Sequence, residues 1–167
     1  SMGNILFNNM SIFDPPEKYI KWKDIPTVHK QSHDCFIALF HGPVHGTKTD
    51  LGYEISNKSY PISLFDGHDI ALLGDIHKLQ DLQLYDSDEG LPYVHYAGSL
   101  IMQNHGESIT GHGYSVWDVE KVKYDHIEIP NDYGHFTIDI QKGKLNTDLT
   151  NIPKKARLRI RCFESVA

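Results

Sequence analysis

The sequence has few of the features that mark secreted, disulfide-linked or membrane-spanning proteins. Its 167 residues include two cysteines, Cys35 and Cys162, which lack the close spacing of a zinc ribbon or a disulfide framework. No apolar run approaches the roughly 18 residues that a membrane span needs, and the first residues do not resemble a secretory signal. We therefore expect an intracellular protein, cytoplasmic or nuclear, with no membrane partner.

The balance of charge narrows the class of protein further. The formal net charge is -6, which argues against a generic nucleic-acid coat protein. Hydrophobic residues make up 40% and charged residues 23% of the chain, so a packed core is expected. Eleven histidines are a high number for this length, and most of them stand beside glycine or aspartate.

Most of the chain has the hydrophobic patterns of β-strands. The predicted strands are 35–40, 69–73, 93–97, 114–119, 125–129, 136–140 and 158–163. Helical patterns are limited to single turns near 17–22 and 61–65. The predicted fold class is therefore α+β but β-rich, with sheet packed on sheet and few helices.

Two of the predicted buried strands end in polar side chains beside a glycine. His41 follows the first strand, and Asp75 and His77 follow the second. Because the carboxyl ends of neighbouring strands share one edge of a sheet, these side chains are expected to converge. Imidazole and carboxylate together suit Mn, Zn or Fe, so the three residues are candidate metal ligands. The alternative is that each is an ordinary loop residue bonded to backbone.

A third strand end carries a polar loop. Ser99, Asn104 and His105 follow the strand that reaches Ala97, and they supply hydrogen-bonding side chains suited to a phosphate or a base edge. The alternative is a turn that holds Asn104 and the following Gly106 in left-handed conformations.

The last predicted strand alternates apolar and basic residues. Arg157, Arg159 and Arg161 share one face, separated by about 6.8 Å, which is near the spacing of phosphates along a nucleic-acid strand. Lys154 and Lys155 extend this basic segment. The pattern predicts a nucleic-acid contact, or alternatively a solvated edge strand protected by charge.

The order of these motifs resembles the second half of the calcineurin-like metallophosphoesterases, and most closely the SbcD-type DNA repair nucleases and their viral and phage relatives. The matching segments are His41-Gly42, Gly74-x-x-His77-Lys78-x-Gln80, Tyr96-x-Gly98-Ser99-Leu100, Gly106-Glu107 and Gly113-Tyr114-x-x-Trp117-Asp118. The ordered set is fairly specific, although no single segment is.

This resemblance implies part of a two-sheet β-sandwich and a hydrolase that cleaves phosphodiester bonds with two metal ions. His41 and His77 match metal-binding histidines of the family, and Asp75 stands where the family has a further histidine. Ser99, Asn104 and His105 would contact substrate. The expected cofactor is Mn²⁺, with Mg²⁺, Fe or Zn as alternatives, and the expected partners are DNA and a repair ATPase subunit.

The sequence departs from the family in lacking its earlier motifs, which supply the remaining ligands and the catalytic histidine. We therefore expect residues 1–3 to be a tag remnant, 4–145 the C-terminal half of a metallophosphoesterase domain, and 146–167 a linker with the basic terminal strand. The isolated chain is predicted to be largely inactive. A non-catalytic interaction or capping module on the same fold, and a phosphodiesterase for substrates other than nucleic acid, remain alternatives.

Overall fold

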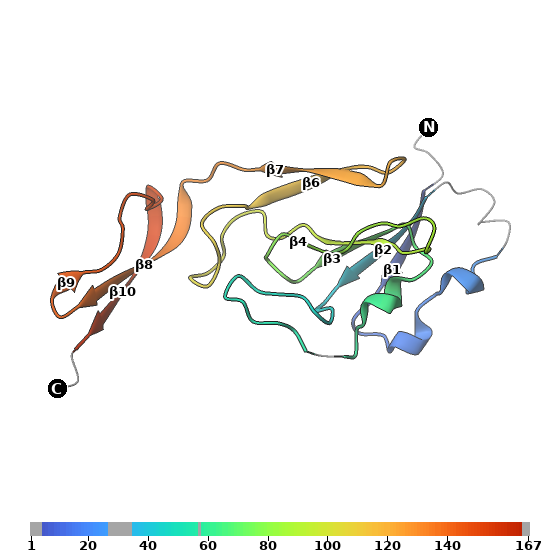
Figure 1. Cartoon of the computed structure of the whole chain (residues 1–167), viewed down its shortest axis with the longest axis horizontal. Helices are drawn as coiled ribbons and strands as arrows, with labels where there is room; N and C mark the ends of the chain where they lie inside the picture. The colour runs from blue at the N-terminus through green and yellow to red at the C-terminus, as the bar shows by residue number, and fades with distance from the viewer. Residues whose placement is uncertain (1–4, 27–34, 57, 165–167) are drawn as a thin grey trace.

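The structure, a computed structural model, describes residues 5–26, 35–56 and 58–164. These residues form a β-rich fold with several sheets, and their helices are three short 3-10 turns (Figure 1). The predicted β-rich class with few helices is therefore confirmed. The expected tag remnant at residues 1–3 lies outside the described residues.

A five-stranded sheet forms the body of the molecule. Its strands are β1 (Ile5–Met10), β2 (Cys35–His41), β3 (Ile70–Gly74), β4 (Gln80–Gln83) and β5 (Tyr93–Tyr96). Their order across the sheet is β1-β2-β3-β5-β4, in which β4 is antiparallel and the other four are parallel. The carboxyl ends of four strands therefore lie along one edge of this sheet.

One face of the five-stranded sheet is covered by the 3-10 turns η1 (Pro16–Lys18), η2 (Trp22–Asp24) and η3 (Ile62–Phe65) and by the loops around them. Phe65 of η3 is fully buried and meets Phe40 of β2 edge to face. Burying a side chain of this size stabilises a fold by about 1.5–3 kcal/mol. This face holds the larger part of the hydrophobic core.

The opposite face is covered by a hairpin of β6 (Gly113–Asp118) and β7 (Lys123–Glu128). Val122, in the turn of this hairpin, packs with Ile37 and Ile70 of the sheet. Sheet therefore packs on sheet, as the sequence predicts. Beside this contact, His95 of β5 bonds both to Asp81 of β4, at 2.7 Å, and to Ser115 of β6, at 2.9 Å.

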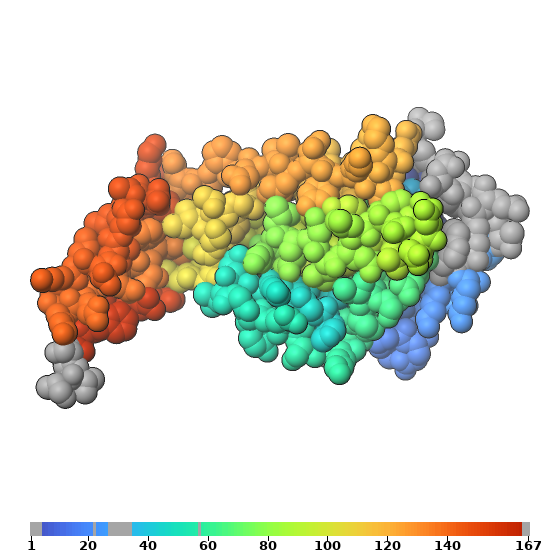
Figure 2. All heavy atoms as spheres, in the orientation of Figure 1, coloured from blue at the N-terminus to red at the C-terminus, as the bar shows by residue number. Residues whose placement is uncertain are grey.

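The C-terminal residues form a separate three-stranded sheet at the end of the molecule farthest from β1 (Figures 1 and 2). Its strands are β8 (Tyr133–Gln141), β9 (Lys144–Leu145) and β10 (Lys155–Phe163), in the order β10-β8-β9. β10 pairs with β8 in parallel along its whole length. The boundary expected between residues 145 and 146 therefore falls inside one sheet.

Each of the seven strands expected from the sequence is present, with ends shifted by up to three residues. The hydrophobic patterns do not indicate β1, β4 or β9. β4 and β9 are short, and the register of β4 with β5 is interrupted between Asp81 and Gln83. In the part of the chain that the structure describes, no helix is long and apolar enough to span a membrane.

Candidate functional site

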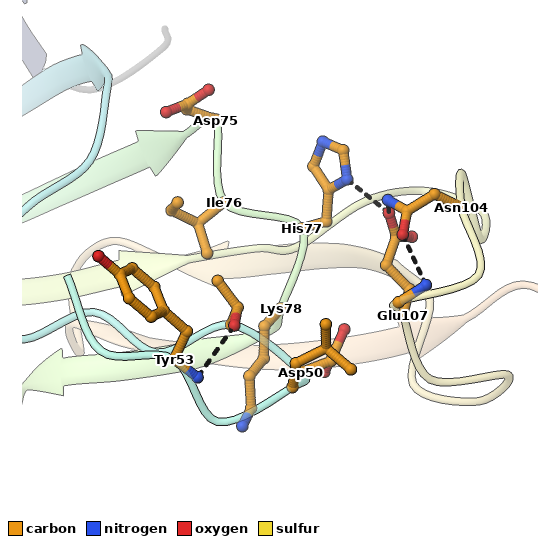
Figure 3. A pocket seen from close by; sticks show the side chains of 11 residues that line it. Asp50, Tyr53, Asp75, Ile76, His77, Lys78, Asn104 and Glu107 are labelled. Atoms are coloured by element: carbon orange, nitrogen blue, oxygen red, sulfur yellow. Dashed lines mark hydrogen bonds and ion pairs between the residues drawn. The ribbon is translucent and has the colours of Figure 1, made fainter.

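A pocket of about 390 Å³ opens at the carboxyl edge of the five-stranded sheet. Its walls come from three loops that follow the parallel strands β2, β3 and β5. The loop after β2 contributes Asp50 and Tyr53, the loop after β3 contributes Asp75 and His77, and the loop after β5 contributes Glu107 (Figure 3). This is the position where open α/β sheets place binding sites.

A histidine and a buried carboxylate are in direct contact in this pocket. Nδ1 of His77 lies 2.8 Å from Oε1 of Glu107, whose side chain is 5% exposed. Because a carboxylate can only accept, Nδ1 carries the proton in this bond, and Nε2 of the neutral ring keeps its lone pair. The His77 side chain is 38% exposed, so it remains accessible to a ligand.

Glu107 is itself held in place by its own loop. Its Oε2 accepts a hydrogen bond from the backbone N–H of Gln103 at 2.8 Å, and the Asn104 side-chain amide donates to Oε1. The backbone N–H of Gly106 in turn donates to Oδ1 of Asn104 at 2.7 Å. The carboxylate is therefore oriented before any ligand arrives.

The loops after β3 and β5 are joined by a close backbone contact. The N–H of Ser99 donates to the carbonyl of His77 at 2.9 Å. Gly98 has φ +75°, and a Cβ at this residue would lie 2.8 Å from the backbone nitrogen of Leu79. Only glycine combines this φ with so close an approach, so Gly98 positions His77 relative to the loop that carries Glu107.

The two other candidate metal ligands lie along the same edge: Asp75 lines the same pocket as His77, and His41 ends β2. The ring of His41 lies over Gly74, where a Cβ would be 2.5 Å from its Nδ1. Asp75 has φ +88°, an unusual conformation for a residue other than glycine, and in Figure 3 its carboxylate and the His77 ring point in different directions. Among the described residues, no three His, Cys, Asp or Glu side chains form a group able to hold a metal ion.

The three candidate substrate-binding residues have different surroundings. Asn104 lines the pocket. Ser99 is buried behind it, with its hydroxyl 2.9 Å from Nδ1 of His112. His105 faces the C-terminal sheet, where its ring meets that of His135 edge to face at 4.8 Å. The pKa of His105 is lowered by desolvation and by the nearby Arg159 and His135.

Sequence reasoning did not assign a role to Glu107, Asp50 or Lys78, which line the pocket. For Glu107 a signal was present, because Gly106-Glu107 is one of the motifs that carry the family resemblance. For Lys78 a signal was also present, because it belongs to the matching segment Gly74-x-x-His77-Lys78-x-Gln80. Asp50 has no comparable signal, since it stands in a loop whose course is set by tertiary packing.

The basic residues of β10 do not form a uniform row. Arg161 makes a two-pronged ion pair with Asp139 of β8, with both N···O distances 2.7 Å. Lys155 lies over the ring of Tyr133, 4.9 Å from its centroid. Arg157 and Arg159 are exposed and have no acidic partner among the described residues. A nucleic-acid contact at Lys154, Lys155, Arg157, Arg159 and Arg161 stays a prediction.

Comparison with known proteins finds a similarity to a viral protein. No family model matches the chain. The chain is 38% identical over 162 residues to a protein of Acanthamoeba polyphaga mimivirus named "Uncharacterized protein R555". The match covers 93% of this chain but 11% of the mimivirus protein, so the chain spans about a tenth of the length of this relative. The name of the relative states no activity.

Proposed function

We propose that this chain is the C-terminal half of a metal-dependent phosphoesterase of the SbcD-type nuclease class, with phosphodiester bonds of DNA as substrate and a repair ATPase as partner. The observation that carries the proposal is the His77–Glu107 pair. Metal-binding histidines usually donate their second ring N–H to a carboxylate, which fixes the ring and raises its basicity. His77 has this arrangement with Glu107.

The residues of this chain fit part of a metal site. His77 offers its Nε2 at the pocket. His41 ends β2 and Asp75 directly follows β3, at the same edge of the sheet. A bound metal ion would supply polarisation of a phosphate and a more acidic bound water. The protein itself would orient His77 through Glu107. Further ligands would have to come from outside the described residues, since these contain no group of three.

The absence of a three-ligand group in the described residues also favours a second function. In this alternative the chain is a non-catalytic interaction or capping module that retains the sheet and the pocket. The isolated chain is then expected to bind no metal at His77. Metal binding at the pocket therefore separates the two functions without any assay of activity.

The test is a titration of the ¹⁵N-labelled 167-residue chain with Mn²⁺, which broadens NMR signals close to its binding site. We expect selective broadening of the amides of residues 74–78 and 104–107, lost in His77→Gln and retained in His135→Gln, the matched histidine variant in the C-terminal sheet. Mg²⁺ serves as the diamagnetic control. Broadening that is unchanged in His77→Gln would contradict the proposed metal site.

Hydrolysis is tested separately. The chain alone is expected to show little Mn²⁺-dependent hydrolysis of a generic phosphodiester or of DNA, because its ligand set is incomplete. Robust turnover that disappears in His77→Ala would show that the site is already complete within these residues. For a longer protein that contains this chain, cleavage of the generic diester but not of DNA would move the proposal to a phosphodiesterase for other substrates.

A further inference from the structure

The C-terminal sheet ends in a long, regular and unpaired strand. β10 has nine residues, pairs with β8 without interruption, and forms the outer edge of the sheet. No described strand lies on its other side. Its backbone contains no proline and no bulge, the features that usually prevent an edge strand from pairing with another chain.

The β4 edge of the five-stranded sheet provides a contrast. β4 is four residues long, and its register with β5 shifts between Asp81 and Gln83. Its Asp81 carboxylate also accepts a hydrogen bond from Tyr124 of the covering hairpin. A short, irregular and covered strand is a poor template for a further strand. β10 is neither short, nor irregular, nor covered by another described strand. The charge of its arginines is its one protection against pairing.

The backbone groups at the open edge of β10 are available for pairing. Lys155 donates its N–H to Asp132, and Phe163 accepts from the N–H of Lys142, so the odd-numbered residues direct their backbone groups toward β8 and its flanking residues. In a strand the alternate residues point the other way. The N–H and C=O groups of Leu158, Ile160 and Cys162 therefore face the open edge.

The side chains of β10 define the chemistry of a matching strand. Leu158 and Ile160, which are 53% and 61% exposed, lie on one face of the sheet. Leu145 of β9, which is 52% exposed, lies on the same face beyond β8. Arg157 and Arg159 lie on the other face without acidic partners among the described residues. The open edge is thus apolar on one side and cationic on the other.

The neighbouring strand β8 shows which side chains pair with those of β10. β8 places Ile138 opposite Ile160 and Asp139 opposite Arg161, and the second pair forms the two-pronged ion pair described above. An outer strand that alternates apolar and acidic residues would repeat both contacts. A second copy of β10 in antiparallel pairing would instead place arginine opposite arginine, which is unfavourable.

We propose that the open edge of β10 binds an extended polypeptide segment that alternates acidic and apolar residues, by adding it as a fourth strand to the C-terminal sheet. The main-chain hydrogen bonds would give affinity, and the two faces of the strand would give specificity. A phosphate backbone could use the arginines and the open N–H groups, but neither the open C=O groups nor the apolar face. The observations therefore favour a polypeptide over a nucleic acid.

The test uses the 167-residue chain and a fluorescein-labelled nonapeptide in which valine and glutamate alternate. Fluorescence anisotropy should show binding that weakens roughly fivefold when glutamine replaces glutamate, as expected for two exposed ion pairs. The double variant Arg157→Gln/Arg159→Gln should weaken it by a similar factor. The matched variant Lys18→Gln/Lys58→Gln, on another surface, should leave it unchanged.

Two peptides separate strand addition from simple charge attraction. One is N-methylated at its valines and the other at its glutamates, so each blocks one edge of the peptide backbone. We expect one of them to lose binding and the other to retain it. Bound peptide should also slow hydrogen exchange at the Leu158, Ile160 and Cys162 amides.

Four results with peptides or DNA, and a fifth with the chain alone, would overturn the proposal. The first four are absence of peptide binding, equal binding of both methylated peptides, equal binding of a valine–lysine peptide, and tighter binding of a DNA oligonucleotide that the arginine variants weaken. Self-association of the chain through the β10 amides, seen by light scattering with exchange protection, would identify a second copy as the occupant and would also overturn it.

Discussion

Nδ1 of His77 and Oε1 of Glu107 lie 2.8 Å apart, although thirty residues separate them in the sequence. The contact joins the loop after β3 to the loop after β5, and so links two neighbouring strands of the sheet at the pocket. It also leaves Nε2 of His77 as the ring atom free to accept from or coordinate a ligand. This one hydrogen bond therefore holds the two loops of the pocket together and also sets the tautomer of His77.

Replacing Glu107 with glutamine should disturb both the packing of the two loops and the tautomer of His77. Glu107 accepts hydrogen bonds at both oxygens, so the NH₂ group of glutamine would face a donor at one of them. We expect the free energy of unfolding to fall by about 1–3 kcal/mol. We also expect the His77 ring to populate both tautomers, which long-range ¹⁵N–¹H NMR distinguishes. The exposed Glu120→Gln should change neither quantity, and a fixed His77 tautomer in Glu107→Gln would contradict the assigned role of Glu107.

Two glycines at the carboxyl edge should respond very differently to alanine. At Gly98 the methyl group would meet backbone atoms of the loop after β3, and φ is +75°. Gly98→Ala should therefore lower the free energy of unfolding by about 2 kcal/mol or more, measured by chemical denaturation. At Gly74 the obstacle is the exposed His41 ring, which can rotate away. Gly74→Ala should cost less than about 1 kcal/mol while shifting the His41 signals, and a cost equal to that of Gly98→Ala would contradict this explanation.

Acidification should destabilise the fold below the ordinary pKa of histidine. Burial lowers the pKa of His68 and of His95 in the folded state, although carboxylates near both rings oppose the shift. The unfolded chain then binds more protons than the folded one, so stability is complete above about pH 6.5 and decreases as the pH falls toward the lowered values. The slope should approach about 1.4 kcal/mol per pH unit for each histidine.

Urea unfolding between about pH 7.5 and about pH 5.5 measures this effect. His68→Gln removes one of the two rings and should make the dependence shallower. A free energy of unfolding that is constant or rises on acidification over this range would contradict the prediction.

The two cysteines should differ sharply in reactivity. Burial and the neighbouring Asp69 raise the pKa of Cys35 to about 11, and the thiol is enclosed between β1 and the hairpin face. Cys162 is exposed on β10. A chromogenic disulfide reagent at about pH 8 should therefore titrate one thiol in the native chain and the second only after unfolding. Cys162→Ser should abolish the native reaction, whereas rapid labelling of Cys35 in that variant would show that the sheet opens.

Seven strands could be predicted from the sequence because each is a short apolar or alternating run, as in Cys35–His41 and Gly113–Asp118, whereas β1, β4 and β9 have no such pattern. The edge of the sheet that carries the pocket was also predictable, because parallel strands place their ends together. The pairing of His77 with Glu107 was not, since it depends on how a loop of about a dozen residues folds back after β5. The orientations of His41 and Asp75 could not be predicted for the same reason, because the backbone conformation after a strand decides where a side chain points.

His95 has consequences for the order in which the fold assembles. Its ring, with Asp81, connects β4, β5 and β6, and Tyr124 of β7 bonds to the same carboxylate. A two-stranded hairpin is at best marginally stable alone, so β6 and β7 gain their stability by docking on a sheet that already exists. The hairpin is thus expected to be the late-folding piece of the body, and its docking encloses an imidazole that the nascent sheet leaves open to water.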